Sequence, residues 1–207
     1  MLFEPTRVFL IRHGQTAWNA ERRIQGHLDV ALNSIGQAQA ERLAAVLAGE
    51  PLAAIYCSDL QRACQTAAPL AAATGAPLRL DAALRERSFG HFEGLTYADI
   101  ESRWPTEAAL WRQRDLRYRP GDGEALPAFS ARCVDAAARL AAAHGGTAIA
   151  LVTHGGVLDC LYRAAAGVAL DAPRSWALDN ASLNRLLFNG EGFVLVGWDD
   201  RAHLDAG

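Results

Sequence analysis

The sequence contains no lysine. All 20 of its basic residues are arginine. A chain without lysine cannot form a lysine Schiff base, and it cannot build the phosphate-binding loop that depends on a lysine. Both of these enzyme classes are therefore excluded. Because the arginines are outnumbered by 23 acidic residues, the net charge is −3, which offers no broad basic surface for nucleic acid.

Cysteine and long apolar runs are also scarce. The four cysteines show neither a CxxC pair nor a zinc-binding spacing, which favours reduced, structural thiols and a cytoplasmic location. No stretch approaches the roughly 18 apolar residues of a membrane span. The first five residues lack the basic and apolar regions of a signal peptide. We therefore expect neither a membrane nor a nucleic acid as partner.

What the chain does have is a regular alternation of strand and helix signals. Strands are predicted at 7–11, 53–57, 78–80 and 147–153, helices at 34–48, 61–73, 125–143 and 156–166, and a closing hairpin at 182–189 and 192–198. Such alternation is typical of βαβ units. We predict an α/β fold over 1–207 as a single domain, with three layers (α/β/α) and a mostly parallel central sheet. Ser34 is the candidate N-cap of the first long helix.

The region 88–124 interrupts this pattern. It is rich in Gly, Pro, Trp and Arg, and we expect it to form a small cap over the carboxyl edge of the sheet, the edge at which the parallel strands end. Its clustered arginines are Arg112, Arg114, Arg117 and Arg119. Two interpretations stay open for them, a lid that reads anionic substrates and an ordinary solvated basic face. The tryptophans expected to be packing anchors are Trp104, Trp111, Trp176 and Trp198.

Three of the predicted strands end at polar residues that precede a glycine or a helix. These residues are Arg12, His13 and Gly14 after the first strand, Ser58 and Arg62 after the second, and His154, Gly155 and Gly156 after the strand at 147–153. Ligands of open α/β sheets bind at this edge. Guanidinium groups pair with phosphate oxygens two at a time, and a helix N-terminus favours an anion. The pattern therefore predicts a phosphate site, in which a neutral imidazole can attack phosphorus.

A phosphoryl-transfer site also needs an acid for the leaving oxygen. The segment 84–94 supplies two candidates, Glu86 and Glu93. A carboxyl group beside a dianionic phosphate keeps its proton more readily, because ionising it would add a like charge. Such a group suits general acid catalysis near neutral pH.

Five segments resemble, in order, the sequence blocks of the histidine phosphatase superfamily, also called the phosphoglycerate-mutase-like family. They are residues 12–19 (RHGQTAWN), 25–36, 58–67, 84–94 and 153–156. One such block would be weak evidence, since Arg-His-Gly is a three-residue string. Five blocks in the order of the family, spread over most of the chain, make the resemblance specific.

The resemblance implies a role for each matching residue. His13 would be the nucleophile and Glu86 the proton donor, whereas Glu93 would be structural. The groups that would hold the phosphoryl oxygens are Arg12, Arg62 and His154. Further phosphate or substrate contacts are implied at Gly14, Thr16, Asn19, Gln25, Gly26, Ser58, Arg87 and Gly155. No metal or organic cofactor is implied, and two arginines in the site would repel a cation.

The resemblance covers both phosphatases and mutases. The signature of the family's mutases is similar to Arg-His-Gly-Glu-Ser. This chain instead has Gln15-Thr16 after Arg-His-Gly, as in many phosphatases. The expected cap is short, and residues 111–114 break the arginine pair that grips the substrate carboxylate in mutases. The turn at 120–124 resembles the phosphatase type, although Ala125 stands where serine is usual.

We therefore expect a metal-independent phosphomonoesterase that acts on a small phosphorylated metabolite through a phosphohistidine. A cofactor-dependent phosphoglycerate mutase is the alternative, and a catalytically idle phosphate-sensing or partner-binding module is the third interpretation. The physiological substrate stays open. A homodimer is one expectation for the assembly.

Overall fold

In the computed structural model, which describes residues 4–205, a six-stranded sheet forms the middle layer. Its strands are β1 (Thr6–Arg12), β2 (Leu52–Cys57), β3 (Leu78–Leu80), β4 (Ala148–Thr153), β5 (Leu183–Phe188) and β6 (Phe193–Asp200). The strand order is β3-β2-β4-β1-β5-β6. The first four strands in this order pair in parallel, while β5 runs antiparallel to both β1 and β6. Residues 1–3 and 206–207 of the expected single domain lie outside the described part.

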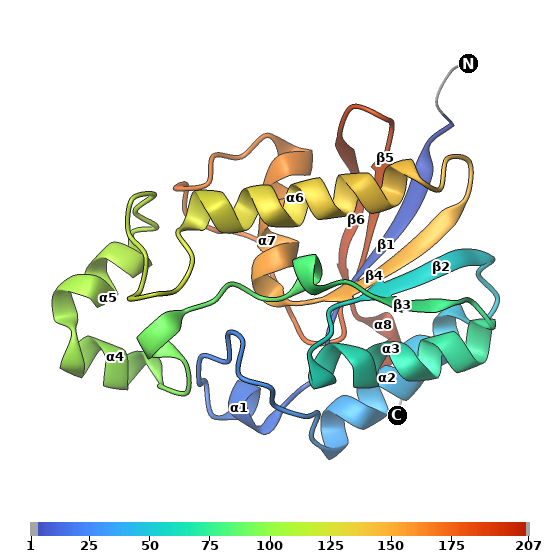
Figure 1. Ribbon diagram of the computed structural model, residues 1–207. Coiled ribbons are helices and arrows are strands. Elements are labelled where there is room, and N and C mark those ends of the chain that lie inside the picture. Colours follow the sequence, from blue (N-terminus) through green and yellow to red (C-terminus); the bar gives the residue numbers. More distant parts are fainter. Residues whose placement is uncertain (1–3, 206–207) are drawn as a thin grey trace.

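Helices cover both faces of this sheet (Figure 1). On one side lie α2 (Ser34–Leu47), α3 (Gln61–Thr74) and the short α8 (Ala202–Asp205), and on the other α6 (Leu126–Ala142) and α7 (Gly155–Ala166). The mostly parallel sheet and the three-layer α/β/α prediction are therefore confirmed.

The alternation of side chains along β1 divides the core in two. Val8 and Leu10 pack in a cluster with residues of α6 and α7, whereas Phe9 and Ile11 pack with residues of α2 and α3. Successive strand residues point to opposite faces of a sheet, so an apolar run serves both layers. This burial holds the end of β1, and the residues that follow it, between two packed layers.

The start of α2 differs from the prediction by one residue. Its N-cap is Asn33, not Ser34, and the Asn33 side chain accepts a hydrogen bond from the Gly36 N–H. Both residue types make good caps, but the cap must have extended backbone, and Asn33 does (φ −83°, ψ 179°). Ser34 is already the first residue of the helix.

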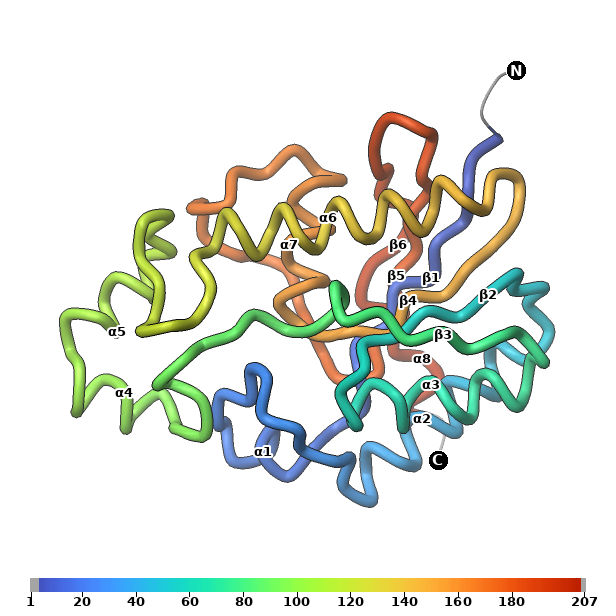
Figure 2. The backbone as a smooth tube through the Cα atoms, viewed as in Figure 1, coloured from blue at the N-terminus to red at the C-terminus, as the bar shows by residue number. Residues whose placement is uncertain are grey.

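The cap contains the short helices η2 (Gly90–Phe92), α4 (Tyr97–Arg103) and α5 (Pro105–Arg112), and it follows η1 (Ala82–Leu84). It projects to one side of the strands, as the tube in Figure 2 shows. A small cluster of its own, with Phe92 and Ile100 fully buried, holds it together. The short α1 (Ala17–Ala20) follows β1 beneath it. In the described part of the chain, no helix is long and apolar enough to span a membrane.

Candidate active site

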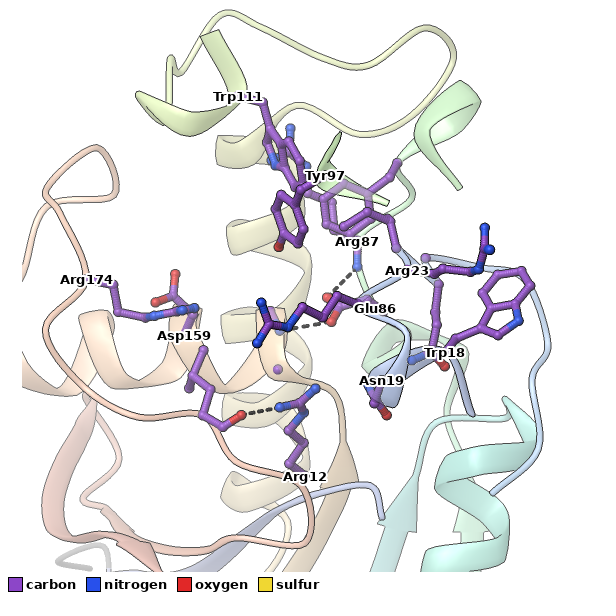
Figure 3. Close-up of a pocket in the computed structure, with 18 of the residues that line it drawn as sticks. Arg12, Trp18, Asn19, Arg23, Glu86, Arg87, Tyr97, Trp111, Asp159 and Arg174 are labelled. Carbon is purple, nitrogen blue, oxygen red and sulfur yellow. Dashed lines mark hydrogen bonds between the residues drawn. The ribbon is translucent and has the colours of Figure 1, made fainter. Parts of the chain in front are cut away.

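A cleft of about 1090 Å³ opens where β1 ends and α7 begins, and the cap forms its far wall. Figure 3 shows Arg12 at its base, Glu86 near the centre, and Tyr97 and Trp111 from the cap above. The residues predicted from the sequence that line this cleft are Arg12, His13, Asn19, Gln25, Gly26, Arg62, Glu86, Arg87 and Gly155. The structure thus brings most of the predicted site together.

His13 follows β1 directly and is only 3 % exposed. Its Nδ1 lies 2.7 Å from the carbonyl oxygen of Gly14. Because a carbonyl can only accept, Nδ1 carries the hydrogen and Nε2 keeps the lone pair. Burial, with the charges of Arg62 and Arg12, holds the pKa of His13 well below its ordinary value. His13 is therefore a neutral imidazole with Nε2 as its free nucleophilic atom.

His154 is the fully buried N-cap residue of α7, and its ring centroid lies 5.2 Å from that of His13. Its Nδ1 accepts a hydrogen bond from Arg62 Nε at 3.2 Å. Burial and the charge of Arg62 keep the pKa of His154 well below normal, so the ring is neutral and its hydrogen sits on Nε2. That buried N–H has no partner among the described residues. It is a donor available to an anion.

The two arginines of the site are held by backbone carbonyls. Arg62, fully buried near the start of α3, donates to the carbonyl oxygens of Gly26 at 2.8 Å and Leu28 at 3.0 Å. Burial lowers the pKa of Arg62 to about 10, so it stays cationic near neutral pH. Arg12 donates through Nη1 to the Leu178 carbonyl, and its buried Nε has no partner within residues 4–205. Arg12 therefore offers a second free donor.

Glu86 is anchored at the start of α7. Its carboxylate accepts hydrogen bonds from the backbone N–H of Gly156 at 3.0 Å and from that of Arg87 at 2.8 Å. A Cβ atom at position 156 would lie 2.1 Å from Glu86 Oε1, so any other residue there would displace the Glu86 carboxylate. The second glycine after His154 thus has a steric purpose, because it lets Glu86 reach the site.

Asn19, near the end of α1, points its amide nitrogen away from its anchors. Its Oδ1 accepts from the N–H and the hydroxyl of Thr16, both at 3.0 Å, and from Asn180 Nδ2 at 3.2 Å. With the oxygen engaged, the Nδ2 donors of Asn19 stay available to a ligand.

The buried His154 is not among the residues that line the cleft, and neither are three further predicted phosphate contacts, Gly14, Thr16 and Ser58. Thr16 is fully buried and caps α1. The N–H of Gly14 donates to Thr66 Oγ1 at 2.9 Å, and Ser58 Oγ accepts from the Leu60 N–H at 3.3 Å. A strand end places a residue at the sheet edge but does not set the direction of its side chain. In the structure these three residues support the wall behind the site.

Glu93, the other acid candidate, also lies outside the cleft lining. Its Oε1 accepts from the backbone N–H groups of His27 at 3.1 Å and Phe89 at 2.9 Å. Glu93 therefore ties the loop after α1 to the base of the cap.

The cap arginines divide into two pairs. Arg112 and Arg114 line the cleft together with Arg22, Arg23 and Arg87, whereas Arg117 and Arg119 do not. Of the four tryptophans expected to be packing anchors, Trp111 and Trp176 also line it.

Sequence reasoning missed the segment 173–180. It supplies Arg174, Trp176 and Asp179 to the cleft wall, and Asn180 Nδ2 donates to the His13 carbonyl at 3.0 Å. A signal was available in the predicted hairpin. Because β5 runs antiparallel to β1, the residues just before β5 must lie at the carboxyl edge of the sheet.

Within residues 4–205, no group of three or more His, Cys, Asp or Glu side chains is arranged to hold a metal ion. The four cysteines are all free thiols. Around His13 the polar groups that line the cleft are instead mainly hydrogen-bond donors and cations, with Glu86 as a carboxylate among them.

Fold and site together define a three-layer α/β protein with a cleft lined by His13, Arg12 and Arg62 at the carboxyl edge of its sheet. Residues 8–201 match the family described as "Histidine phosphatase superfamily (branch 1)", and the chain belongs to this superfamily. The resemblance found in the five sequence blocks is thereby confirmed.

Individual relatives carry different names. "Phosphoglycerate mutase-like protein 4" of Arabidopsis thaliana is 39% identical over 203 residues, which cover 96% of this chain and 86% of that protein. The "Metal-independent phosphoserine phosphatase" of the same plant is 35% identical, over 98% of this chain and 85% of its own length. The solved structure of "Bacillus stearothermophilus YhfR" superposes with a TM-score of 0.90 at 33% identity, over 96% of this chain and 99% of that one.

Proposed function

We propose that the protein is a metal-independent phosphomonoesterase that hydrolyses small phosphorylated metabolites through a phosphohistidine at His13. One observation carries this proposal. The neutral, buried His13 presents a lone pair on Nε2, while the adjacent Arg12 Nε and His154 Nε2 are buried donors without partners in the described chain. A nucleophile surrounded by unused donors suits a phosphate ester, because its oxygens can accept all of them.

In the first half-reaction, the oxygens of the phosphate accept hydrogen bonds from Arg12, His154 and Asn19. His13 Nε2 attacks phosphorus while the ester P–O bond breaks, and protonated Glu86 gives its proton to the departing oxygen. The imidazole becomes cationic as the N–P bond forms, and the hydrogen bond from Nδ1 to the Gly14 carbonyl stabilises that charge. Positioning and charge neutralisation supply most of the catalysis in phosphoryl transfer.

In the second half-reaction, water attacks the phosphohistidine. The Glu86 carboxylate, held by the Gly156 and Arg87 N–H groups, takes a proton from that water. The P–N bond breaks, inorganic phosphate leaves, and His13 returns to its neutral form. A single carboxyl group thus serves as acid and then as base.

The mutase alternative shares the first half-reaction and differs in the acceptor, which is a substrate hydroxyl instead of water. One relative that is 39% identical to this chain has a mutase-like name, and the mutase therefore stays the alternative. The idle-module interpretation is disfavoured by the presence of both the nucleophile and the acid. The cytoplasmic location, the lack of a cofactor and the homodimer stay predictions from the sequence.

The decisive test is the His13→Ala variant, assayed for p-nitrophenyl phosphate hydrolysis with a chelator present. We expect loss of at least about 1000-fold in kcat, the scale seen when a covalent nucleophile is removed. The matched control is His144→Ala, since His144 bonds to the Tyr56 hydroxyl outside the cleft. Wild-type turnover in His13→Ala would contradict the proposal. Phosphoryl exchange between 2- and 3-phosphoglycerate, stimulated by a bisphosphoglycerate, would favour the mutase.

A further inference from the structure

One corner of the cleft contains two buried polar atoms that the phosphoryl chemistry does not use. They are Asp159 Oδ1 and Trp176 Nε1, and neither has a hydrogen-bond partner in the described part of the chain. Asp159 is 4 % exposed, and both residues line the cleft. Figure 3 shows Asp159 and Arg174 on one side of the pocket, opposite Trp18 and Asn19. We call Asp159 and Trp176 the α7 corner.

The position of Asp159 follows from the geometry of α7. It lies four residues after Gly155, the first residue of the helix, which corresponds to about 6 Å along the helix axis. Its Oδ2 accepts hydrogen bonds from Arg114 Nη2 at 2.7 Å and from Arg163 Nε at 3.0 Å. These two arginines fix the carboxylate and leave Oδ1 as an unused acceptor in the first turns of α7.

Trp176 is held in the same corner. Its ring stacks on Tyr162 with centroids 4.0 Å apart, and Arg163 Cζ lies 4.7 Å from its centroid. Arg163 therefore contacts both Asp159 and Trp176. The indole N–H can only donate, whereas a carboxylate oxygen can only accept. The two cleft-lining residues of the α7 corner thus offer one fixed donor and one fixed acceptor, and Arg163 Nη2 beside them is a further buried donor without a partner in the described part of the chain.

We infer that the α7 corner binds a hydroxyl group on the alcohol part of the substrate, two or three bonds beyond the ester oxygen. This inference rests on the proposed function. A hydroxyl is both donor and acceptor, so it can donate to Asp159 Oδ1 and accept from the Trp176 N–H. A ketone lacks the hydrogen for Asp159, and an ammonium lacks the lone pair for Trp176. An ammonium would also approach two arginines that share a single carboxylate.

Three esters with the same chain, phosphate and carboxylate test the inference. They are 3-phosphoglycerate, 3-phosphohydroxypyruvate and O-phosphoserine, which carry a hydroxyl, a ketone and an ammonium at the same carbon. For the wild-type protein we expect kcat/KM to be at least about tenfold higher for the hydroxyl ester than for either of the others, because a built polar site rejects analogues that leave it unpaired. Equal values for the three esters would overturn the inference.

The Asp159→Asn variant separates recognition from a structural role. Its amide oxygen can keep the hydrogen bonds from both arginines. The amide NH₂ then faces the corner, and the corner becomes a site with two donors. We expect the ratio of kcat/KM for the ketone ester to that for the hydroxyl ester to rise by at least about tenfold. The matched control is Asp135→Asn on α6, an exposed carboxylate outside the cleft, which should keep the wild-type ratio.

Equal losses on all three esters in Asp159→Asn would show a structural role and overturn the inference. If that variant does not fold, the kcat/KM values of the wild-type protein on the three esters test the inference. If no ester is hydrolysed, and p-nitrophenyl phosphate is not either, the proposed function is wrong. In that case calorimetric binding of the three compounds tests the corner separately, and equal affinities would overturn it.

Discussion

The floor of the cleft and the cap both depend on arginine, and they use it in opposite ways. In the floor, formed by Arg12, His13, Arg62 and His154, the arginines donate to backbone carbonyls and to a neutral histidine. Neither forms a salt bridge within residues 4–205. In the cap, Arg112 pairs with Glu101 and Arg114 with Asp159. The positive charge of the floor therefore stays available to an anion, whereas these two cap arginines already pair with carboxylates.

This difference has an energetic cost. Buried cations without a counterion destabilise a folded chain, because desolvation is not offset by a partner. The lowered pKa values of Arg12 and Arg62, caused first by burial, have the same origin. Proteins keep such destabilising groups at functional sites, where an anionic ligand supplies the missing negative charge. An exposed pair such as Arg112 with Glu101 adds little to stability and tolerates change.

The largest effect on the contrast between floor and cap is expected from Glu86→Gln, which removes the proton of the acid but can keep the Gly156 hydrogen bond. For esters with poor leaving groups, such as glycerol phosphate, we expect kcat/KM to fall about 100-fold or more, the usual scale of general acid catalysis. For p-nitrophenyl phosphate the loss should be clearly smaller, because that leaving group needs little protonation.

Steady-state kinetics on both substrates provides the measurement. The control is Glu93→Gln, which should affect both substrates alike, since Glu93 bonds to backbone N–H groups outside the cleft lining. Equal losses on both substrates in Glu86→Gln would show that another group is the acid.

A smaller effect, on the free energy of unfolding, is expected when the pH is lowered. This effect also distinguishes the floor of the cleft from the cap. His13 and His154 have pKa values well below normal in the folded protein, mainly through burial, while an unfolded histidine titrates near pH 6.5. As pH falls below about 6.5, the unfolded chain takes up protons that the folded chain does not. The free energy of unfolding should then decrease by about 1.4 kcal/mol per pH unit for each histidine.

Urea unfolding at several pH values between 5 and 7 measures this slope. In His13→Ala, the decrease in the free energy of unfolding per pH unit should be smaller than in the wild type by the contribution of one histidine. An unchanged slope would mean that His13 is charged in the folded protein, and the mechanism would lose its neutral nucleophile.

The smallest effect is expected from Arg112→Ala in the cap. Its side chain is 65% exposed and that of its partner Glu101 is 61% exposed, so the free energy of unfolding should change by less than about 0.5 kcal/mol. Hydrolysis of p-nitrophenyl phosphate should stay near the wild-type rate. A tenfold loss on carboxylate-bearing esters alone would restore the lid interpretation and break the contrast between floor and cap.

The elements and the floor of the site could be predicted because their signals are local. The apolar run before Arg12 predicts β1, and the cluster Thr153-His154-Gly155-Gly156 predicts a strand end followed by a helix. Parallel strands then end at one edge by geometry alone. The direction in which Thr16 and Ser58 point has no local signal of this kind, and their burial behind the wall became visible only in three dimensions.

By itself, the sequence determined the three-layer α/β fold, the family and the residues that form the floor of the cleft. Only the tertiary structure decided which nitrogen of His13 is free, since the charges of Arg62 and Arg12 hold the ring neutral and the Gly14 carbonyl takes its hydrogen. It also brought Asp159 beside Arg114, 45 positions away in the chain, and set Trp176 in the same corner. Such pairings depend on how packed layers meet, because the contacts of a buried polar group are made by residues remote in sequence.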